Sequence, residues 1–277
     1  MRLFQMQKSR GLYRSHKPHK VYLTFDDGPS KQTDKILDIL DEYGVKATFF
    51  VVGRDGEEAK ERLKKIYERG HTIGMHSYSH DYTDIYESVE AFRADFLKSK
   101  EFIFDAIGVE SSFYRFPGGS SNTLSELNMS VFVDFLQEQG VEYYDWNISS
   151  GDGGGNLMPA EMILENCVKY ISRYETSIIL MHDSANKTTT VEALPQLLEQ
   201  ILAMEDTVIL PITESSKPIH HSIKVKEEEK KETEKPEEKV TKEKENVQTV
   251  TGNDAGSGET EETSETKRKN NTKENKE

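Results

Sequence analysis

The sequence of 277 residues contains one cysteine and no long apolar run. A lone cysteine excludes an internal disulfide, and Cys167 lies in a helical pattern of apolar residues, which indicates a core position. No stretch is apolar over about twenty residues or resembles the apolar core of a signal peptide, so we expect neither a transmembrane helix nor a signal peptide in this chain. A Gly-x-Ser-x-Gly turn is also missing, which argues against a serine hydrolase.

Positive charge is scarce as well, because 36 lysines and arginines stand against 50 aspartates and glutamates, giving a formal net charge of -14. This balance argues against a nucleic acid or an anionic surface as the partner of the whole molecule. The start of the chain is the exception, and we interpret residues 1–19 as an exposed basic arm or the flank of a missing membrane segment. The basic residues of the first twenty positions are Arg2, Lys8, Arg10, Arg14, Lys17 and Lys20.

Aromatic residues disappear after about residue 215, where a Lys/Glu-rich stretch begins and leads into a Gly, Ser, Thr, Glu and Asn-rich end. Such a segment cannot bury enough apolar surface to offset the entropy of ordering. We therefore predict a folded domain over residues 20–214 and a disordered tail over residues 215–277. A solvated linker is the simplest interpretation of the tail, and a cell-wall tether or a partner-binding arm are the alternatives.

Within the folded domain, apolar strand-like runs alternate with helical patterns, which is typical of a parallel α/β fold. The predicted strands are Val21–Phe25, Ala47–Val52, His71–Met75, Phe113–Phe116, Glu142–Trp146, Ser177–Met181 and Thr207–Leu210. The predicted helices are Lys31–Glu42, Glu57–Arg69, Val89–Ala106, Leu127–Gln139, Pro159–Arg173 and Thr190–Met204. No Gly-x-Gly-x-x-Gly turn follows the first strand, so we predict a distorted (β/α) barrel of about seven parallel strands rather than an open doubly wound sheet.

Polar clusters follow five of these predicted strands, and the carboxyl ends of parallel barrel strands meet at one face. Two aspartates, Asp26 and Asp27, end the first strand, and two histidines, His76 and His80, follow the third. One carboxylate and two imidazoles form an open metal site, and the other carboxylate could take a proton from the metal's water. Taken alone, the aspartates could instead form a turn or a helix cap, and the histidines could share an exposed helix face. Spacing alone also leaves open which aspartate binds the metal.

The run Thr24-Phe25-Asp26-Asp27-Gly28-Pro29, together with His76-Ser77-x-x-His80, resembles the first two motifs of the polysaccharide deacetylases, carbohydrate esterase family 4. The resemblance implies that Asp26 is the general base and that Asp27, His76 and His80 hold the metal.

The segment Arg115-Phe116-Pro117-Gly118-Gly119 resembles the third motif of this family. The resemblance implies that Arg115 orients Asp26 and that the oxyanion is stabilised by a backbone amide near Gly118. An arginine there could otherwise form only a structural salt bridge. The more usual family form has Pro and Tyr at positions 116 and 118, so this chain lacks one wall of the substrate groove.

Asp145-Trp146 and the later run Leu180-Met181-His182 resemble the fourth and fifth motifs. The resemblance implies that His182 is the general acid, that Asp145 tethers it, and that Trp146 and Leu180 shape the pocket for the acetyl methyl group. Asp152 falls near a further acidic position of the family. Three glycines follow it where a tryptophan is expected, and we assign it no role.

The resemblance covers about residues 20–213 and implies a metal-dependent hydrolase of N-acetyl groups on an amino-sugar polymer, with peptidoglycan N-acetylglucosamine as the first candidate. Chitin oligomers, poly-N-acetylglucosamine and O-acetylated xylan are alternative substrates. Zinc is the expected metal, and Asp-His-His also suits cobalt, nickel or manganese. We expect a monomer at the cell surface or outside the cell. A cytoplasmic hydrolase of small acetylated molecules and a carbohydrate-binding pseudo-enzyme are the other hypotheses.

Overall fold

The structure, a computed structural model, describes residues 18–224. The predicted basic arm lies almost wholly outside these residues, as does the predicted tail beyond residue 224. In the described part the strands are β1 (His19–Asp26), β2 (Thr48–Val51), β3 (Thr72–Met75), β4 (Phe113–Tyr114), β5 (Glu142–Tyr143), β6 (Ile148–Ser149), β7 (Thr176–His182) and β8 (Thr207–Ile209). The α-helices are α1 (Lys31–Glu42), α2 (Glu57–Glu68), α3 (Tyr82–Ile85), α4 (Val89–Ile107), α5 (Met129–Glu138), α6 (Ala160–Val168) and α7 (Thr188–Leu202).

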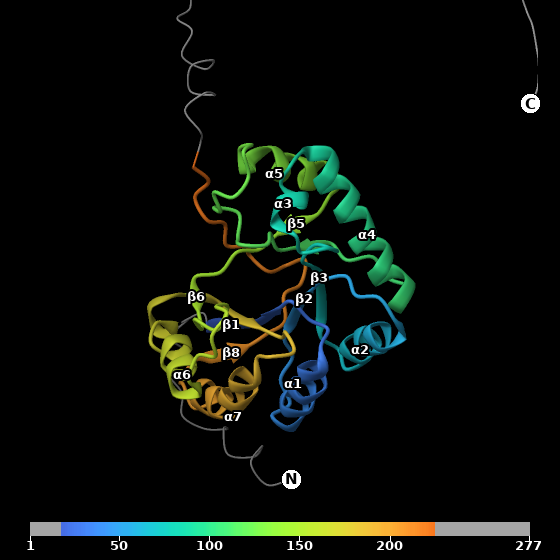
Figure 1. The fold of residues 1–277 in the computed structure, drawn as a ribbon. Helices are drawn as coiled ribbons and strands as arrows, with labels where there is room; N and C mark the ends of the chain where they lie inside the picture. The colour runs from blue at the N-terminus through green and yellow to red at the C-terminus, as the bar shows by residue number, and fades with distance from the viewer. Residues whose placement is uncertain (1–17, 225–277) are drawn as a thin grey trace, which may run out of the picture. The chain divides into compact units, whose positions relative to one another are not determined.

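All of these strands pair in parallel, in the order β5-β4-β3-β2-β1-β7-β6, with β8 paired to the start of β1. Helices α1, α2, α6 and α7 lie on one side of the sheet, and α3, α4 and α5 gather beyond β3 and β5 (Figure 1). The sheet curls, which confirms the predicted distorted (β/α) barrel. No helix among residues 18–224 is long and apolar enough to cross a membrane.

One extended stretch, residues 142–149, spans the opening between the two edges of the curled sheet; we call it the closing segment. Its first residues pair with β4 and its last residues pair with β7. Between them, Tyr144 N donates to Tyr114 O at 2.9 Å, and Asn147 N donates to Ile178 O at 3.2 Å. The predicted strand Glu142–Trp146 is therefore shortened to the two residues of β5. Strand β6, which begins two residues beyond its predicted end, and the short helix α3 were not predicted.

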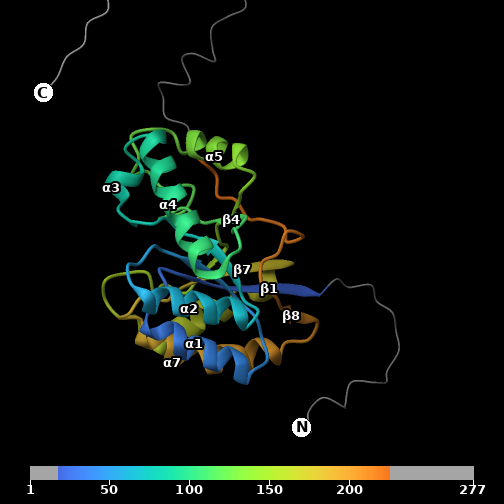
Figure 2. The same ribbon diagram turned by 90° about the vertical axis from the view of Figure 1, so that its right-hand side faces the viewer.

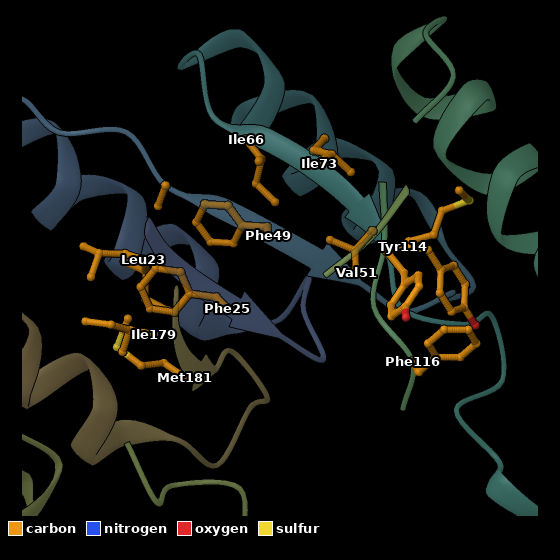
Figure 3. Packing of buried hydrophobic residues seen from close by; sticks show 14 of the residues in the cluster. Leu23, Phe25, Phe49, Val51, Ile66, Ile73, Tyr114, Phe116, Ile179 and Met181 are labelled. Carbon is orange, nitrogen blue, oxygen red and sulfur yellow. The ribbon is translucent and has the colours of Figure 1, made fainter. Parts of the chain in front are cut away.

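Alternation along β1 decides which side chains enter the barrel. Leu23 and Phe25 face the helices and belong to the main core, where Phe25 stacks on Phe49 of β2 with ring centroids 5.2 Å apart (Figure 3). Thr24 and Asp26 point the other way and are buried inside the barrel. Asp26 thus reaches the interior by the regular pleat of the strand.

The folded chain continues past the predicted boundary at residue 214. The chain after β8 runs past β4 towards α5 (Figure 2, orange), and we call its residues 216–223 the C-terminal strap. Ile219 of the strap packs against the apolar cluster inside the barrel, and the Tyr144 hydroxyl donates to Ser216 O at 3.0 Å. The boundary prediction was wrong because a few apolar residues sit in a segment whose average composition is that of a linker.

Candidate active site

Asp26 and Asp27 occupy the carboxyl end of β1 and face the same site. Asp26 is 2% exposed, whereas Asp27 has a φ of 73°, in the left-handed region that side chains rarely adopt. A regular strand would send Asp27 to the opposite face from Asp26. The left-handed backbone at Asp27 is the physical reason that two adjacent carboxylates can share one site.

The two histidines follow β3 on a similarly unusual backbone. Ser77 and His80 have φ values of 76° and 55°, so three of the four non-glycine residues with positive φ among residues 18–224 lie at this site. Such conformations persist only where the surroundings hold them. Asp95 of α4 provides that hold, because its carboxylate accepts hydrogen bonds at 2.8 Å from the backbone amides of Tyr78 and Ser79.

Asp27, His76 and His80 converge in a way that suits a metal ion. Oδ1 of Asp27 lies 3.3 Å from His80 Nε2 and 3.7 Å from His76 Nε2, and the three ligand atoms all lie within 4.8 Å of one another. Asp27 Oδ1 is buried and accepts no hydrogen bond from the described residues. A buried carboxylate oxygen without a donor is costly unless a cation or water satisfies it, so the donor set fits a divalent ion.

His76 is prepared for this role by its other ring nitrogen. Nδ1 lies 2.8 Å from the carbonyl oxygen of Arg115, which can only accept, so Nδ1 carries the proton and the lone pair is on Nε2. Burial also lowers the pKa of His76 to about 3, which keeps the ring neutral. A neutral imidazole with a free Nε2 is the form that binds metals.

Arg115 is fully buried, and its guanidinium contacts side chains and backbone carbonyls from several strands. It donates to Asp26 Oδ1 at 2.8 Å, to Thr24 Oγ1 at 2.7 Å and to the carbonyl of Tyr144 at 2.9 Å, and its guanidinium lies 4.2 Å from the Phe50 ring centroid. Burial raises the pKa of Asp26 above its ordinary value, and the Arg115 charge opposes that rise. The contact predicted between Arg115 and Asp26 is present.

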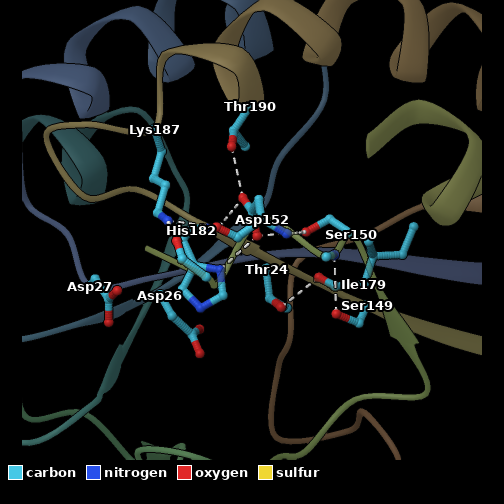
Figure 4. Close-up of polar contacts among 12 residues, drawn as sticks. Thr24, Asp26, Asp27, Ser149, Ser150, Asp152, Ile179, His182, Lys187 and Thr190 are labelled. Atoms are coloured by element: carbon cyan, nitrogen blue, oxygen red, sulfur yellow. Dashed lines mark hydrogen bonds and ion pairs between the residues drawn. The ribbon is translucent and has the colours of Figure 1, made fainter. Parts of the chain in front are cut away.

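His182 stands at the end of β7, in register with Asp26 of β1. Its partner is Asp152 and not Asp145, so the predicted tether was wrong (Figure 4). Asp152 Oδ1 lies 2.7 Å from His182 Nδ1, and Asp152 Oδ2 accepts from the His182 backbone amide at 2.9 Å. Burial alone would lower the pKa of His182, but the Asp152 carboxylate outweighs burial and the pKa is raised.

The loop that carries Asp152 is itself firmly held. Its carboxylate also accepts from Ser150 Oγ at 2.6 Å and Thr190 Oγ1 at 2.7 Å. The buried ammonium of Lys187 donates to the carbonyls of Asp152 at 2.6 Å and Gly154 at 2.7 Å. The loop places Gly153 against His182, where an added Cβ would lie 2.9 Å from Cε1 of the ring, so a larger residue does not fit at the position where a tryptophan was expected.

Asp145 joins other segments instead. Its carboxylate accepts from the backbone amide of Ser120 at 2.8 Å and from the backbone amide of His221 at 2.7 Å. Its carbonyl accepts from Arg115 Nη2 at 3.3 Å. Asp145 follows β5, but the sequence could not reveal that the Asp145 carboxylate binds the C-terminal strap.

The predicted substrate-pocket residues lie on different elements. Trp146 is partly buried on the closing segment, and Leu180 is 6% exposed in β7. Gly118 has a φ of 77°, and a Cβ there would lie 3.1 Å from the Tyr82 ring. Tyr82 therefore fills part of the space beside Gly118. Asp152 was assigned no role, and Lys187 and Tyr82 were missed, because their contacts join segments distant in sequence, which sequence periodicity does not encode.

A further buried carboxyl belongs to Asp183, which follows β7 and contacts the end of β1. Its backbone amide donates to Asp26 O at 2.7 Å, and its Oδ2 accepts from Thr33 Oγ1 at 2.6 Å. Burial raises the pKa of Asp183 to about 8. A Cβ added to Gly28 would lie 2.3 Å from Asp183 Oδ2, so this carboxyl fills the space under the turn that follows Asp27.

Comparison with known proteins places these features in a family context. A family model described as polysaccharide deacetylase matches residues 13–131. The putative polysaccharide deacetylase YheN of Bacillus subtilis is 31% identical over 200 residues, which are 68% of each chain. A peptidoglycan-N-acetylglucosamine deacetylase of Bacillus cereus is 33% identical over 200 residues, 70% of each chain. The crystal structure of the catalytic domain of peptidoglycan N-acetylglucosamine deacetylase from Eubacterium rectale is 35% identical with a TM-score of 0.70, covering 79% of this chain and 99% of that one.

Proposed function

Because the chain belongs to the polysaccharide deacetylase family, it is a hydrolase of acetylated polysaccharides, and we propose that it is a metal-dependent enzyme that removes the N-acetyl group of N-acetylglucosamine in peptidoglycan. The observation that carries the proposal is the convergence of Asp27, His76 and His80 beside Asp26, which Arg115 holds. The names of the Bacillus cereus and Eubacterium rectale relatives support the choice of polymer and an extracellular or cell-surface location.

The donor set assigns the metal ligands. Asp27, His76 and His80 would hold a divalent ion, which supplies Lewis acidity to the acetyl carbonyl and to the attacking water when it is bound. Zinc is the first choice for this donor set, with cobalt, nickel and manganese as alternatives.

Asp26 is proposed as the general base. Its Oδ1 is occupied by the bond from Arg115, whereas Oδ2 faces His76 at 3.7 Å and is the oxygen free to take a proton from water. Burial raises its pKa, which brings the carboxylate closer to the basicity that proton abstraction near neutral pH requires. The amide of Gly118 is the proposed donor to the oxyanion.

His182 is proposed as the general acid. Its Nδ1 is engaged by Asp152, so a proton on Nε2 is the one available to the leaving amine. The Asp152 carboxylate stabilises the imidazolium, which an acid needs at the start of the step. Trp146 and Leu180 would line the pocket for the acetyl methyl group. With base, ligands and acid all present, the non-catalytic alternative is disfavoured.

The experiment measures acetate released from purified peptidoglycan, from N-acetylglucosamine oligomers and from acetylated xylan, using metal-stripped protein before and after adding zinc. Release that depends on zinc and is fastest on peptidoglycan is expected. Faster release from another polymer would replace the substrate, and equal release without metal would overturn the metal assignment. Activity only on small acetylated molecules would favour the alternative of a cytoplasmic hydrolase of such molecules.

Two classes of substitution separate the base from the ligands. Asp26→Asn should abolish turnover while zinc still binds, and His76→Ala or His80→Ala should lose zinc as well. Glu192→Gln, which changes an exposed carboxylate on α7, is the matched control and should leave both activity and zinc content unchanged. An active Asp26→Asn enzyme would refute the assignment of the base.

A further inference from the structure

The C-terminal strap is bound to the closing segment at Asp145 and Trp146, two residues that contact Arg115. Asp145 N donates to Ile219 O at 2.8 Å, and His221 N donates to the Asp145 carboxylate at 2.7 Å. The His221 ring adds a third bond, with Nε2 lying 2.6 Å from Trp146 O. Three hydrogen bonds thus fix Asp145 and Trp146 to a segment that composition assigned to the tail.

The same stretch of the closing segment positions Arg115. The guanidinium donates to the carbonyl of Tyr144 at 2.9 Å and to the carbonyl of Asp145 at 3.3 Å, and it lies 5.8 Å from the centroid of the Trp146 ring. Arg115 in turn holds Asp26. Movement of Asp145 and Trp146 would therefore be transmitted to the proposed base through one buried side chain.

The two ring nitrogens of His221 face different segments. Trp146 O can only accept, so Nε2 donates to it, while Nδ1 lies 3.4 Å from the hydroxyl of Ser121 and 3.8 Å from Asp145 Oδ1. The ring also meets the Trp146 ring edge to face, with centroids 4.8 Å apart. One partly buried imidazole thus links the strap, the closing segment and the turn after Gly119.

We propose that the strap is a working part of the active site and that His221 is a positioning residue, which sets Arg115 and the wall formed by Trp146. The inference rests on the proposed function for its kinetic consequence, while its structural part can be tested without activity. The neighbouring His220 provides a natural comparison. Its exposed ring stacks on Tyr143 at 3.8 Å and bonds to Glu142, without a bond to Asp145 or Trp146.

The first test uses the fluorescence of the full-length chain, because Trp146 is its only tryptophan. His221→Ala should shift the emission to longer wavelength and increase quenching by acrylamide, since the ring and the hydrogen bond beside the indole are removed. His220→Ala should leave both unchanged. Unchanged fluorescence in His221→Ala, or an equal change in His220→Ala, would overturn the contact between the strap and Trp146.

The second test is kinetic. His221→Ala should lower kcat/KM on peptidoglycan by about 10- to 100-fold with zinc content unchanged, the scale expected when catalytic groups are displaced by a fraction of an ångström to one ångström. His221→Gln, whose amide can still donate to Trp146 O, should restore most of the loss. If His221→Ala fails to fold, His221→Phe, which keeps a ring but cannot donate to Trp146 O, serves as the test variant and should show the loss. Altered fluorescence with normal kcat/KM would overturn the role in catalysis. Wild-type protein that releases no acetate from any substrate would refute the proposed function, and the fluorescence comparison would still decide the strap contact.

Discussion

Replacing Asp152 by asparagine tests the corrected partner of His182. The substitution keeps the size of the side chain but removes the charge that faces His182 Nδ1 at 2.7 Å, and it turns one of the acceptor oxygens into a donor. In the wild-type protein the Asp152 carboxylate accepts four hydrogen bonds in all, two from His182 and one each from Ser150 and Thr190. A general acid contributes about 10²- to 10⁴-fold to a rate, so kcat/KM should fall about 100- to 1000-fold, or about 3–4 kcal/mol in the activation free energy.

The assay is the pH dependence of kcat/KM for acetate release. Asp152 raises the pKa of His182, so wild-type protein keeps the acid protonated to higher pH. In Asp152→Asn the alkaline limb of the profile should move to lower pH. The loss should also shrink for acetate esters of acidic phenols, whose leaving group needs little protonation.

Asp145→Asn is the matched control, because sequence resemblance alone would have given that residue the same role. Its carboxylate bonds to Ser120 and His221 instead, so the alkaline limb should stay in place even if the rate falls. The reasoning would be refuted if the limb moved in Asp145→Asn and remained unchanged in Asp152→Asn.

Three further predictions follow from the loops around the site. A Cβ on Gly153 would lie 2.9 Å from His182 Cε1, so Gly153→Ala should lower kcat about tenfold or more, whereas Gly155→Ala, with nothing within 4 Å, should not; steady-state kinetics decide this. Lys187→Met removes the donor to the buried carbonyl of Asp152 and to the carbonyl of Gly154, so urea unfolding should show a loss of about 1–3 kcal/mol, and no loss would refute the account. Asp183 has a pKa raised to about 8, so the folded state holds its proton where the unfolded state releases it, and its contribution to stability declines as pH rises from about 4 to 8. Asp183→Asn should therefore show a smaller decline in the free energy of unfolding over that range, and an identical decline would contradict the shift.

The parts of the molecule that sequence predicts well are those where one local pattern determines the structure. Helix α1 was predicted with its observed bounds, because Ile36, Leu37 and Leu40 form one buried face and Ser30 caps the first turn. The grouping of Asp27, His76 and His80 was also expected, since parallel strand ends meet at one face.

Where the prediction failed, the structure depends on contacts between segments distant in sequence. The choice of Asp152 over Asp145 as the partner of His182 is made by Thr190 and Lys187, which lie more than thirty residues further along the chain. Strand β6 has two residues, too few for any periodicity. The strap is fixed by single apolar residues such as Ile219, whose effect is diluted in a charged neighbourhood.

The closing segment has a consequence for how the molecule opens. Strands β5 and β6 are two residues long, and the amides of Tyr144, Asp145 and Asn147 between them each rely on a bond to a different neighbour, the last of them at 3.2 Å. The long strands β1 and β7 pair with each other over seven register positions, so we expect them to separate only when the whole domain unfolds. Proteins open in cooperative units of unequal free energy, and short, singly bonded stretches exchange their amide hydrogens first. Native-state hydrogen exchange should therefore find earlier opening at residues 144–147 than in β1 and β7. Opening there would also release the carbonyls of Tyr144 and Asp145 that hold Arg115 in place.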